Sequence, residues 1–509
     1  MNRKTNVRNG IIMGLVNNAL TIILPFVSRT IIIRQLGIEY VGLGGLFTSI
    51  LQVLSLSELG FGGAVSAFLY KPIADNDTEK IKAILNFIRK IYRMVGLAIL
   101  LFSVALLPFL DGLIAGSVPE ELNIYVLYML YVANTVISYF TYAYKRILLS
   151  ANQRYDIDVS ITSVCIIGQY VIQIILLLLY KNYYMYVVII PLMTATANIL
   201  AYIITTKLYP KYYCEGELEK SDVERIFKNS GGAFCSQIGS TVYLSVDNIV
   251  ISAYLGLMIL GKYNNYYYVI ASLIAIFAVI HNSIRPTIGN IIATEGYVKI
   301  WDYFVEINQI YMMLAIVCCS CCVVLFQDFE SIWAGKDNML DFGIVILITS
   351  MFFVGRLGGV LSIFKESAGL LWEGKFIPLI SAGVNLSLNI FLVNMIGLPG
   401  IIISTIVGSL TVGLPGNVYI TFKYLFKDKG LKKLFFEEMI RLCIQYGVVS
   451  VSCHLLFIKW HVQSWAFLVL KGIVTAIVAM IMVMILNFNH SGMRLLFKTM
   501  RERIAGSKL

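Results

Sequence analysis

The sequence predicts an all-α integral membrane protein with fourteen transmembrane helices, and three observations support this fold class. First, 58% of the 509 residues are hydrophobic and only 14% are charged, with a mean hydropathy of +0.80. Second, apolar stretches long enough to cross a bilayer follow one another along the chain. Third, Lys and Arg gather in alternate connecting segments. Soluble chains are usually about 45–50% apolar and about 25% charged, so soluble, disordered and collagenous classes are excluded.

Each span is identified by its length, because a helix needs roughly 20 mainly apolar residues to cross the hydrocarbon, which also excludes a short-stranded barrel. The second span is long and rich in glycine, so we expect it to bend or break, which membrane helices tolerate where neighbours satisfy the freed backbone groups. The expected spans are 10–33, 40–70, 92–110, 122–144, 157–180, 184–206, 230–255, 263–284, 304–326, 342–364, 376–396, 398–422, 439–458 and 464–486.

The orientation follows from the distribution of Lys and Arg, which favour the cytoplasmic side. With a cytoplasmic N-terminus, the inner segments hold 32 of the 40 Lys and Arg residues, and the outer loops hold five. Both termini are then cytoplasmic. The basic inner segments account for the formal net charge of +11, and they would lie against anionic lipid headgroups. No nucleic-acid partner is therefore implied.

Three inner segments combine an apolar stripe with basic residues, which is typical of helices that lie on a membrane surface. These are 77–93, 423–441 and 493–504. An ordinary solvated connector is the alternative for each of them.

An internal repeat relates the first and seventh spans. RTIIIRQLGIEYVG ends at Gly42 and DNIVISAYLGLMILG ends at Gly261, so that Gly37 matches Gly256 and Gly42 matches Gly261 at one common offset. Both copies sit at odd-numbered spans and share an orientation. This predicts two parallel halves of six helices each, with two helices appended, which is a transporter arrangement.

Ionisable side chains inside the spans are the candidate functional residues, because each costs at least about 2.5–3.5 kcal/mol near the bilayer centre. We expect Arg29 and Asp247 to face each other across a central cavity, since they occupy nearly equivalent places in the two repeats. Glu58 either serves function or braces the bend beside it. Arg356 is a further candidate, whereas a structural role is favoured for Lys471.

Other chemistries lack their sequence signatures. No Gly-rich nucleotide-binding loop, nucleophile triad or paired carboxylates stand out, so no catalytic residue is assigned and the chain is not expected to be an enzyme. Four cysteines in the ninth span have no His or acidic neighbour and fit close helix packing, so no metal site or cofactor is expected.

Two blocks of sequence carry a family resemblance. LGIEYVGLGGLF, SLSELGFGGA and LYKPIADND lie within 29–77, and SVDNIVISAYLGLMILGKYNNYYYVI and IRPTIGNIIATE lie at 245–270 and 284–295. The sequence resembles the Wzx-like polysaccharide and O-antigen repeat-unit flippases of the multidrug/oligosaccharidyl-lipid/polysaccharide superfamily. The last hundred residues are generic.

The resemblance implies a MATE-like fold of two six-helix bundles, and a bacterial inner (cytoplasmic) membrane location. It divides the chain into an N-terminal bundle (1–206), a cytoplasmic linker (207–229), a C-terminal bundle (230–422) and a C-terminal part with the last two helices and a tail (423–509). The implied substrate is an undecaprenyl-pyrophosphate-linked oligosaccharide, moved from the inner to the outer leaflet by alternating access. Membrane lipids and glycan polymerase machinery are the other implied partners.

Within that frame each candidate side chain receives a role. The pyrophosphate contacts are Arg29, Arg34, Arg285 and Arg356, because the guanidinium fork suits phosphate. The coupling or gating residues are Glu58 and Asp247, with H⁺ or Na⁺ left open as coupling ion. A MATE-like multidrug cation exporter and a membrane glycan polymerase or ligase remain the alternatives. A peptidoglycan-precursor flippase and a scaffold without transport are further ones.

Overall fold

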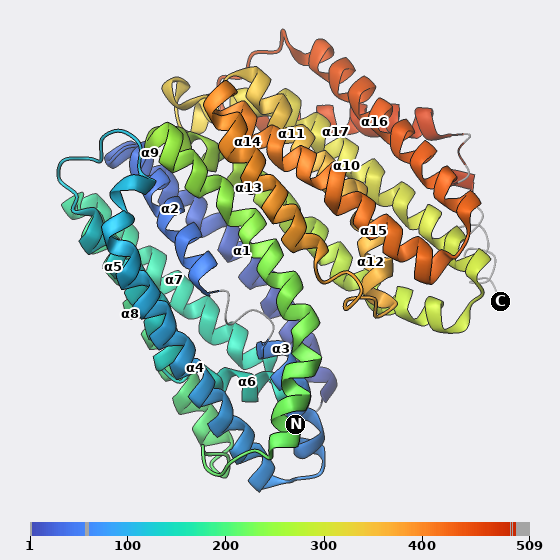
Figure 1. Ribbon diagram of the computed structural model, residues 1–509. Helices are drawn as coiled ribbons and strands as arrows, with labels where there is room; N and C mark the ends of the chain where they lie inside the picture. The colour runs from blue at the N-terminus through green and yellow to red at the C-terminus, as the bar shows by residue number, and fades with distance from the viewer. Residues whose placement is uncertain (1–2, 56–60, 489, 491, 495–509) are drawn as a thin grey trace. The chain divides into compact units, whose positions relative to one another are not determined.

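The computed structural model describes residues 3–55, 61–488, 490 and 492–494, and all regular elements in these ranges are helices (Figure 1). The chain divides into two compact units, Met1–Gly261 and Lys262–Leu509, and the boundary falls within the longest helix. The all-α prediction is therefore confirmed.

The first unit contains eight helices and the first part of a ninth. They are α1 (Arg3–Gln35), α2 (Ile38–Leu54), α3 (Phe61–Ala74), α4 (Thr78–Leu106), α5 (Ile124–Phe140), α6 (Tyr144–Ala151), α7 (Tyr155–Tyr180), α8 (Tyr183–Leu208) and α9 (Lys220–Thr294), with the short 3-10 turns η2 (Leu107–Phe109) and η3 (Asp111–Leu113). Side-chain caps explain several starts: Asp77, Asn123 and Asn182 each accept a hydrogen bond from a backbone N–H in the first turn of α4, α5 and α8.

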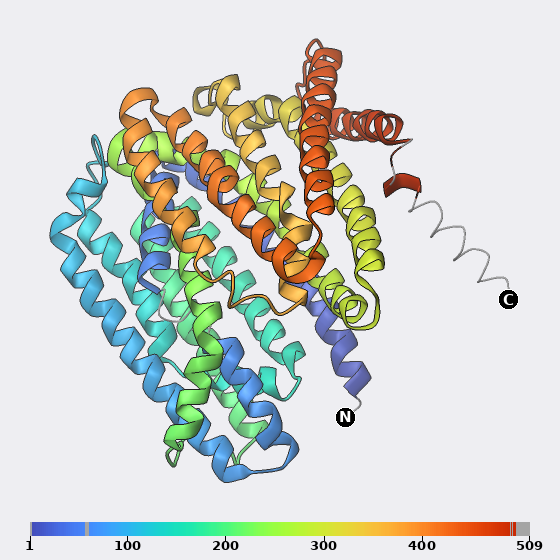
Figure 2. The ribbon, with the colours of Figure 1, turned by 45° about the vertical axis from the view of Figure 1, so that its right-hand side comes forward.

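The second unit contains the rest of α9 and the later helices. They are α10 (Tyr297–Trp333), η4 (Lys336–Asn338), α11 (Phe342–Leu357), α12 (Gly359–Ser367), α13 (Ile377–Ile396), α14 (Leu398–Gly408), η5 (Ser409–Gly413), α15 (Leu414–Thr421), η6 (Phe422–Phe426), α16 (Lys429–Phe457) and α17 (Trp465–Asn487). In this unit α10 is the most buried span and contacts α11, α16 and α17, while α16 also contacts α17 (Figure 2).

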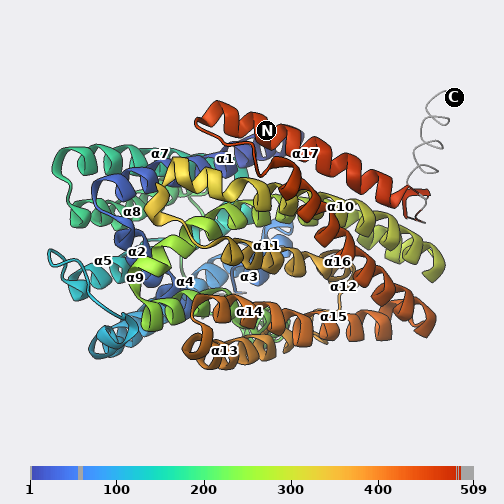
Figure 3. The same cartoon turned by 90° about the horizontal axis from the view of Figure 1, so that it is seen from above.

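The helices of the first unit pack as neighbours. α1 lies against α7, α7 against α8, α8 against α5 and α5 against α4, and the view from above shows α1 and α7 running together (Figure 3). Two units of packed, lipid-length helices make the chain a multi-pass membrane protein.

Eleven helices in the described part are long and apolar enough to cross a membrane, or twelve if α5 and α6, bent by 53°, form one broken span. The stretch Phe234–Thr294 has 61 residues, which is about 90 Å of helix. The predicted count of fourteen stays a prediction.

The expectation of a separate surface helix over 77–93 is wrong. These residues continue without a break into the apolar half of α4. Their apolar stripe is buried within the protein, where Ile84, Leu85 and Ile88 pack near Tyr144 and Leu148 of α6. The stripe therefore faces a helix partner and not lipid. The second expected surface helix, 423–441, is not separate either, because residues 429–441 form the start of the long helix α16. Most of the third, 493–504, lies outside the described residues.

The glycines of the predicted repeat adopt matching backbone conformations. Gly37 has φ 123° and ψ 167°, and Gly256 has φ 85° and ψ 174°. Only glycine enters this region at little cost. Gly37 separates α1 from α2, and Gly256 interrupts α9, so the same residue breaks the helix at the same place in both copies.

Candidate functional site

The predicted arginines fall into two groups, one in each unit. Arg29 and Arg34 lie on α1 in the first unit, whereas Arg285 on α9 and Arg356 on α11 lie in the second.

Arg29 lies beside tyrosine hydroxyls of α8. It is half-buried on α1, and its charge acts on the hydroxyls of Tyr183 and Tyr186. The neighbouring Ser28 is buried and shares a 3.0 Å hydrogen bond with the Tyr186 hydroxyl. Arg29 therefore sits in a polar environment within an apolar helix.

The tyrosines form a connected group around Tyr183. Its hydroxyl lies 3.1 Å from the Tyr131 hydroxyl and donates a 3.1 Å hydrogen bond to the carbonyl of Tyr40. A Cβ atom on Gly44 would lie 3.0 Å from the hydroxyls of both Tyr131 and Tyr183. Glycine at position 44 leaves these hydroxyls room to meet, and this group was not predicted from sequence.

Asp247 is buried on α9, with 7% of its surface exposed. Its neighbours tie α9 to α2: Ser245 donates to Gln52 (3.1 Å) and Asn248 donates to Ser49 (2.8 Å). The register that matches Gly37 with Gly256 also aligns Asp247 with Ser28, one position before Arg29. Asp247 and Arg29 therefore lie on neighbouring positions of the repeat.

For two further candidates the described part of the chain shows no contacts that would form a site. Arg34 is exposed in the last turn of α1, just before the break at Gly37. Glu58 lies outside the described residues.

Arg285 belongs to an ionic cluster between α9 and α12. The Glu366 carboxylate lies 3.2 Å from His281 Nε2 and 3.5 Å from Arg285 Nη1. Ser367 Oγ donates a 3.1 Å hydrogen bond to the carbonyl of Arg285. The two helices are thus joined through one carboxylate that serves two basic side chains.

A buried lysine adjoins this cluster. Lys365 is 9% exposed and its Nζ donates a 2.6 Å hydrogen bond to Asn417 Oδ1 of α15. Sequence reasoning missed Lys365 and Glu366, because the expected span ended at residue 364 and placed both in a solvated loop. Apolar residues recur at helical spacing just before them, at Val360, Leu361, Ile363 and Phe364. This pattern could have extended the expected helix to include Lys365 and Glu366.

Arg356 lies among aromatic rings. Its guanidinium carbon is 5.7 Å from the Phe277 ring centroid and 5.5 Å from the Phe352 ring centroid. Its Nε atom is buried and has no hydrogen-bond partner among the described residues. Phe277 precedes Arg285 by about two helical turns on α9, so Arg356 of α11 lies beside the helix that carries Arg285.

Lys471 has the structural role that the sequence favours. Its Nζ lies 2.7 Å from Asp328 Oδ2 and donates a 2.9 Å hydrogen bond to the carbonyl of Trp460. Within the described ranges, no group of three or more His, Cys, Asp or Glu side chains is placed to hold a metal ion.

Comparison with known proteins decides the family. Residues 7–292 match the family described as polysaccharide biosynthesis protein. The chain belongs to this family. The chain is also 21% identical over 441 residues to the uncharacterized membrane protein MJ1068 of Methanocaldococcus jannaschii, covering 82% of this chain and 83% of the relative.

The fold of the chain is similar to solved transporter structures. The lipid II flippase MurJ in an inward closed conformation has a TM-score of 0.67 at 14% identity, covering 94% of this chain and 99% of that one. An inward-facing multidrug resistance MATE family transporter of the MOP superfamily has a TM-score of 0.59 at 12% identity, covering 83% and 98%. The MATE-like fold predicted from the resemblance is confirmed.

Proposed function

We propose that the protein is a flippase that moves undecaprenyl-pyrophosphate-linked oligosaccharide repeat units from the inner to the outer leaflet of a bacterial cytoplasmic membrane, for surface polysaccharide biosynthesis. The observation that carries this proposal is the position of Arg356 among apolar side chains, with one nitrogen atom left without a hydrogen-bond partner in the described part of the chain. Arg356 is half-buried, and its buried Nε–H has no hydrogen-bond partner among the described residues. Leaving a buried donor without an acceptor is costly, and a pyrophosphate oxygen is such an acceptor.

The substrate explains why cations belong inside these helices. The lipid tail stays in hydrocarbon, while the double phosphate and the sugar hydroxyls need a polar path, because stripping them of hydrogen bonds costs several kcal/mol for each group. Arg285 and Arg356 provide two positive charges beside α9 for the phosphates, and Arg29 and Arg34 provide two on α1. The tyrosine hydroxyls beside Arg29 provide hydrogen-bonding groups that suit a sugar.

Release on the outer side needs an ion or a charge that switches between states. Asp247 and Glu58 are proposed to bind a coupling ion, H⁺ or Na⁺, or to form ion pairs that break during alternating access. The chain itself performs no bond chemistry in this proposal, and downstream glycan polymerase machinery would receive the flipped product.

The proposed topology has fourteen spans and cytoplasmic termini. The 61-residue stretch of α9 is far longer than a bilayer requires, so Gly256 would separate two spans, and α2 with α3 would form another broken one. The proposed halves are the spans within 1–206 and 230–422, joined by the linker 207–229 and followed by 423–509.

Deletion of the gene followed by lipid analysis tests the proposal. We expect glycan-linked carrier lipid to accumulate on the inner face, surface glycan to disappear, and both to be restored by the wild-type gene. Loss of polymer length with normal outward glycan-lipid would instead indicate a polymerase. Normal glycan with lost export of cationic dyes would indicate a multidrug exporter.

A further inference from the structure

A pocket in the second unit lies apart from the arginines discussed above. It has a volume of about 270 Å³ and is lined by α10, the first part of α16 and His490. Three aromatic residues, Trp301, Phe304 and Phe435, form its apolar walls, and Glu437 and Glu438 contribute carboxylates. We call this the α10–α16 pocket.

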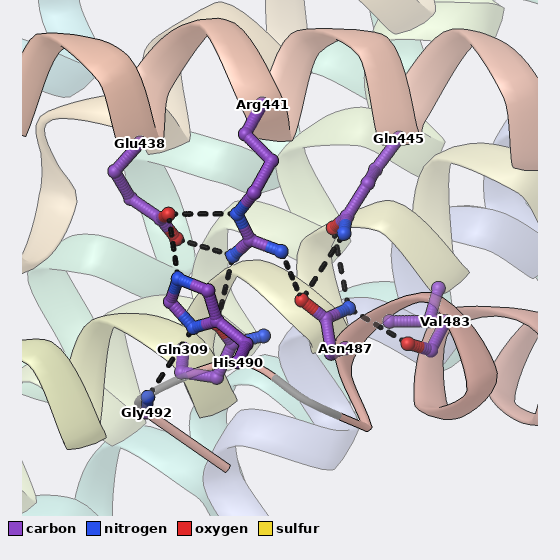
Figure 4. Close-up of polar contacts among 8 residues, drawn as sticks. All are labelled: Gln309, Glu438, Arg441, Gln445, Val483, Asn487, His490 and Gly492. Carbon is purple, nitrogen blue, oxygen red and sulfur yellow. Dashed lines mark hydrogen bonds and ion pairs between the residues drawn. The ribbon is translucent and has the colours of Figure 1, made fainter.

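The cationic side chains at this pocket are already occupied (Figure 4). Arg441 donates to Glu438, to Asn487 and, over 2.9 Å, to Gln309. His490 Nε2 lies 3.1 Å from Glu438, and its Nδ1 accepts a hydrogen bond from the backbone N–H of Gly492. Both basic groups are therefore unavailable to an anionic ligand.

Acceptor capacity remains at the pocket. Asn308 is 3% exposed, and its Oδ1 atom is buried without a hydrogen-bond partner among the described residues. Glu437 is exposed, and its ion pair with Lys433 at 3.7 Å is a weak surface pair. A ligand that fits must therefore donate hydrogen bonds and carry positive charge, which aromatic walls also favour.

The depth of the pocket points to the source of this ligand. α10 has 37 residues and α16 has 29, about 55 and 43 Å of helix, whereas the hydrocarbon core is about 30 Å thick. The pocket residues lie in the first third of α10 and the first half of α16. This half of α16 carries most of its charged side chains, as expected at the level of lipid headgroups. The outer face of α16 is apolar, with Ile440 63% and Ile444 61% exposed.

We propose that the α10–α16 pocket binds an ammonium group, supplied by an amine-bearing lipid such as phosphatidylethanolamine. The ammonium lies against the aromatic walls and donates to Asn308 Oδ1 and the Glu437 carboxylate. The exposed Lys432 and Lys433 on α16 provide positive charge for the lipid phosphate. The site is separate from the substrate path and concerns the lipid surroundings of the protein.

Native mass spectrometry of the full chain, extracted from nanodiscs with equal phosphatidylethanolamine and phosphatidylglycerol, tests the proposal. We expect the wild type to retain phosphatidylethanolamine preferentially. Trp301→Ala and Glu437→Gln should each lower this retention roughly five- to tenfold. Trp372→Ala and Glu373→Gln are matched controls at exposed positions outside the pocket and should retain it fully.

Titration of ethanolamine, whose ammonium group can donate hydrogen bonds, into protein in phosphatidylglycerol nanodiscs, followed by tryptophan fluorescence, separates the two sources of an ammonium. A response that Trp301→Phe and Glu437→Gln both weaken would support the site with a soluble amine as its ligand. If Trp301→Ala fails to fold, Glu437→Gln still decides, because that side chain is exposed. Equal retention of both lipids, or retention that neither pocket variant changes, together with no response to ethanolamine, overturns the proposal.

Discussion

Gly42 of α2 and Gly261 of α9 hold the two copies of the repeat in direct backbone contact. A Cβ atom on Gly42 would lie 2.2 Å from the carbonyl oxygen of Leu257, and a Cβ atom on Gly261 would lie 2.3 Å from the carbonyl oxygen of Ile38. The register of the repeat pairs Ile38 with Leu257 as well as Gly42 with Gly261, so the two contacts are equivalent. The repeat is therefore a reciprocal packing surface, in which each copy supplies the glycine that the other approaches.

Replacing either glycine should destabilise the protein, because the added methyl group meets a backbone carbonyl that cannot move aside. We expect Gly42→Ala and Gly261→Ala each to lower the free energy of unfolding by about 2–3 kcal/mol, measured by denaturant unfolding in detergent micelles. Gly383→Ala is the matched control, since nothing lies within 4 Å of its Cβ, and it should be neutral or stabilising. Equal effects at all three positions would contradict this account.

The Lys471–Asp328 pair makes an asymmetric prediction. Asp328→Asn strands an ammonium whose side chain is only 4% exposed, and should cost about 3 kcal/mol in unfolding free energy. Lys471→Met should cost less, because the Asp328 side chain is 25% exposed and remains hydrated. The double variant should cost less than the sum of the two. Strict additivity in this double-mutant cycle would show that the pair does not act as a unit.

Glu366 is predicted to organise the cluster on α9 and α12. Glu366→Gln removes the carboxylate between His281 and Arg285 and leaves the buried Lys365 without a nearby negative charge. We expect surface glycan export, measured by quantitative lectin binding, to fall at least tenfold, and Glu366→Asp to restore part of it. Glu373→Gln, at an exposed position, is the control. Normal export by Glu366→Gln at normal protein level would show that export does not depend on the cluster that Glu366 joins.

Much of the fold was readable from the sequence, because span length and composition are direct consequences of the bilayer. The matching glycines at 37 and 256 could also be identified from the sequence. Only glycine adopts their backbone conformation at little cost, so both copies of the repeat have glycine at this position. The start of α4 was misread, because an apolar stripe beside basic residues fits a lipid surface and a helix partner equally well, and only the packing against α6 decides between them.

The site was only partly readable. Arginines inside apolar spans or at their ends stand out in a sequence, so Arg29, Arg285 and Arg356 were named as candidates. Their partners were not, since Tyr183 is one of 31 tyrosines and Glu366 lies on a different helix from Arg285, far away along the chain. Such pairings depend on how helices meet, which no local pattern records.

Translocation in reconstituted vesicles tests the central claim most directly. Wild-type protein, Arg356→Ala and Arg356→Lys would be reconstituted with a fluorescent undecaprenyl-pyrophosphate-linked oligosaccharide, and the fraction of sugar accessible to an external glycosidase would be followed in time. We predict transport by the wild type, at least a tenfold slower rate for Arg356→Ala, partial recovery for Arg356→Lys, and a normal rate for the exposed control Arg93→Ala. Absence of transport by well-folded wild-type protein with its coupling-ion gradient supplied, or equal rates for the wild type and Arg356→Ala, would contradict the account.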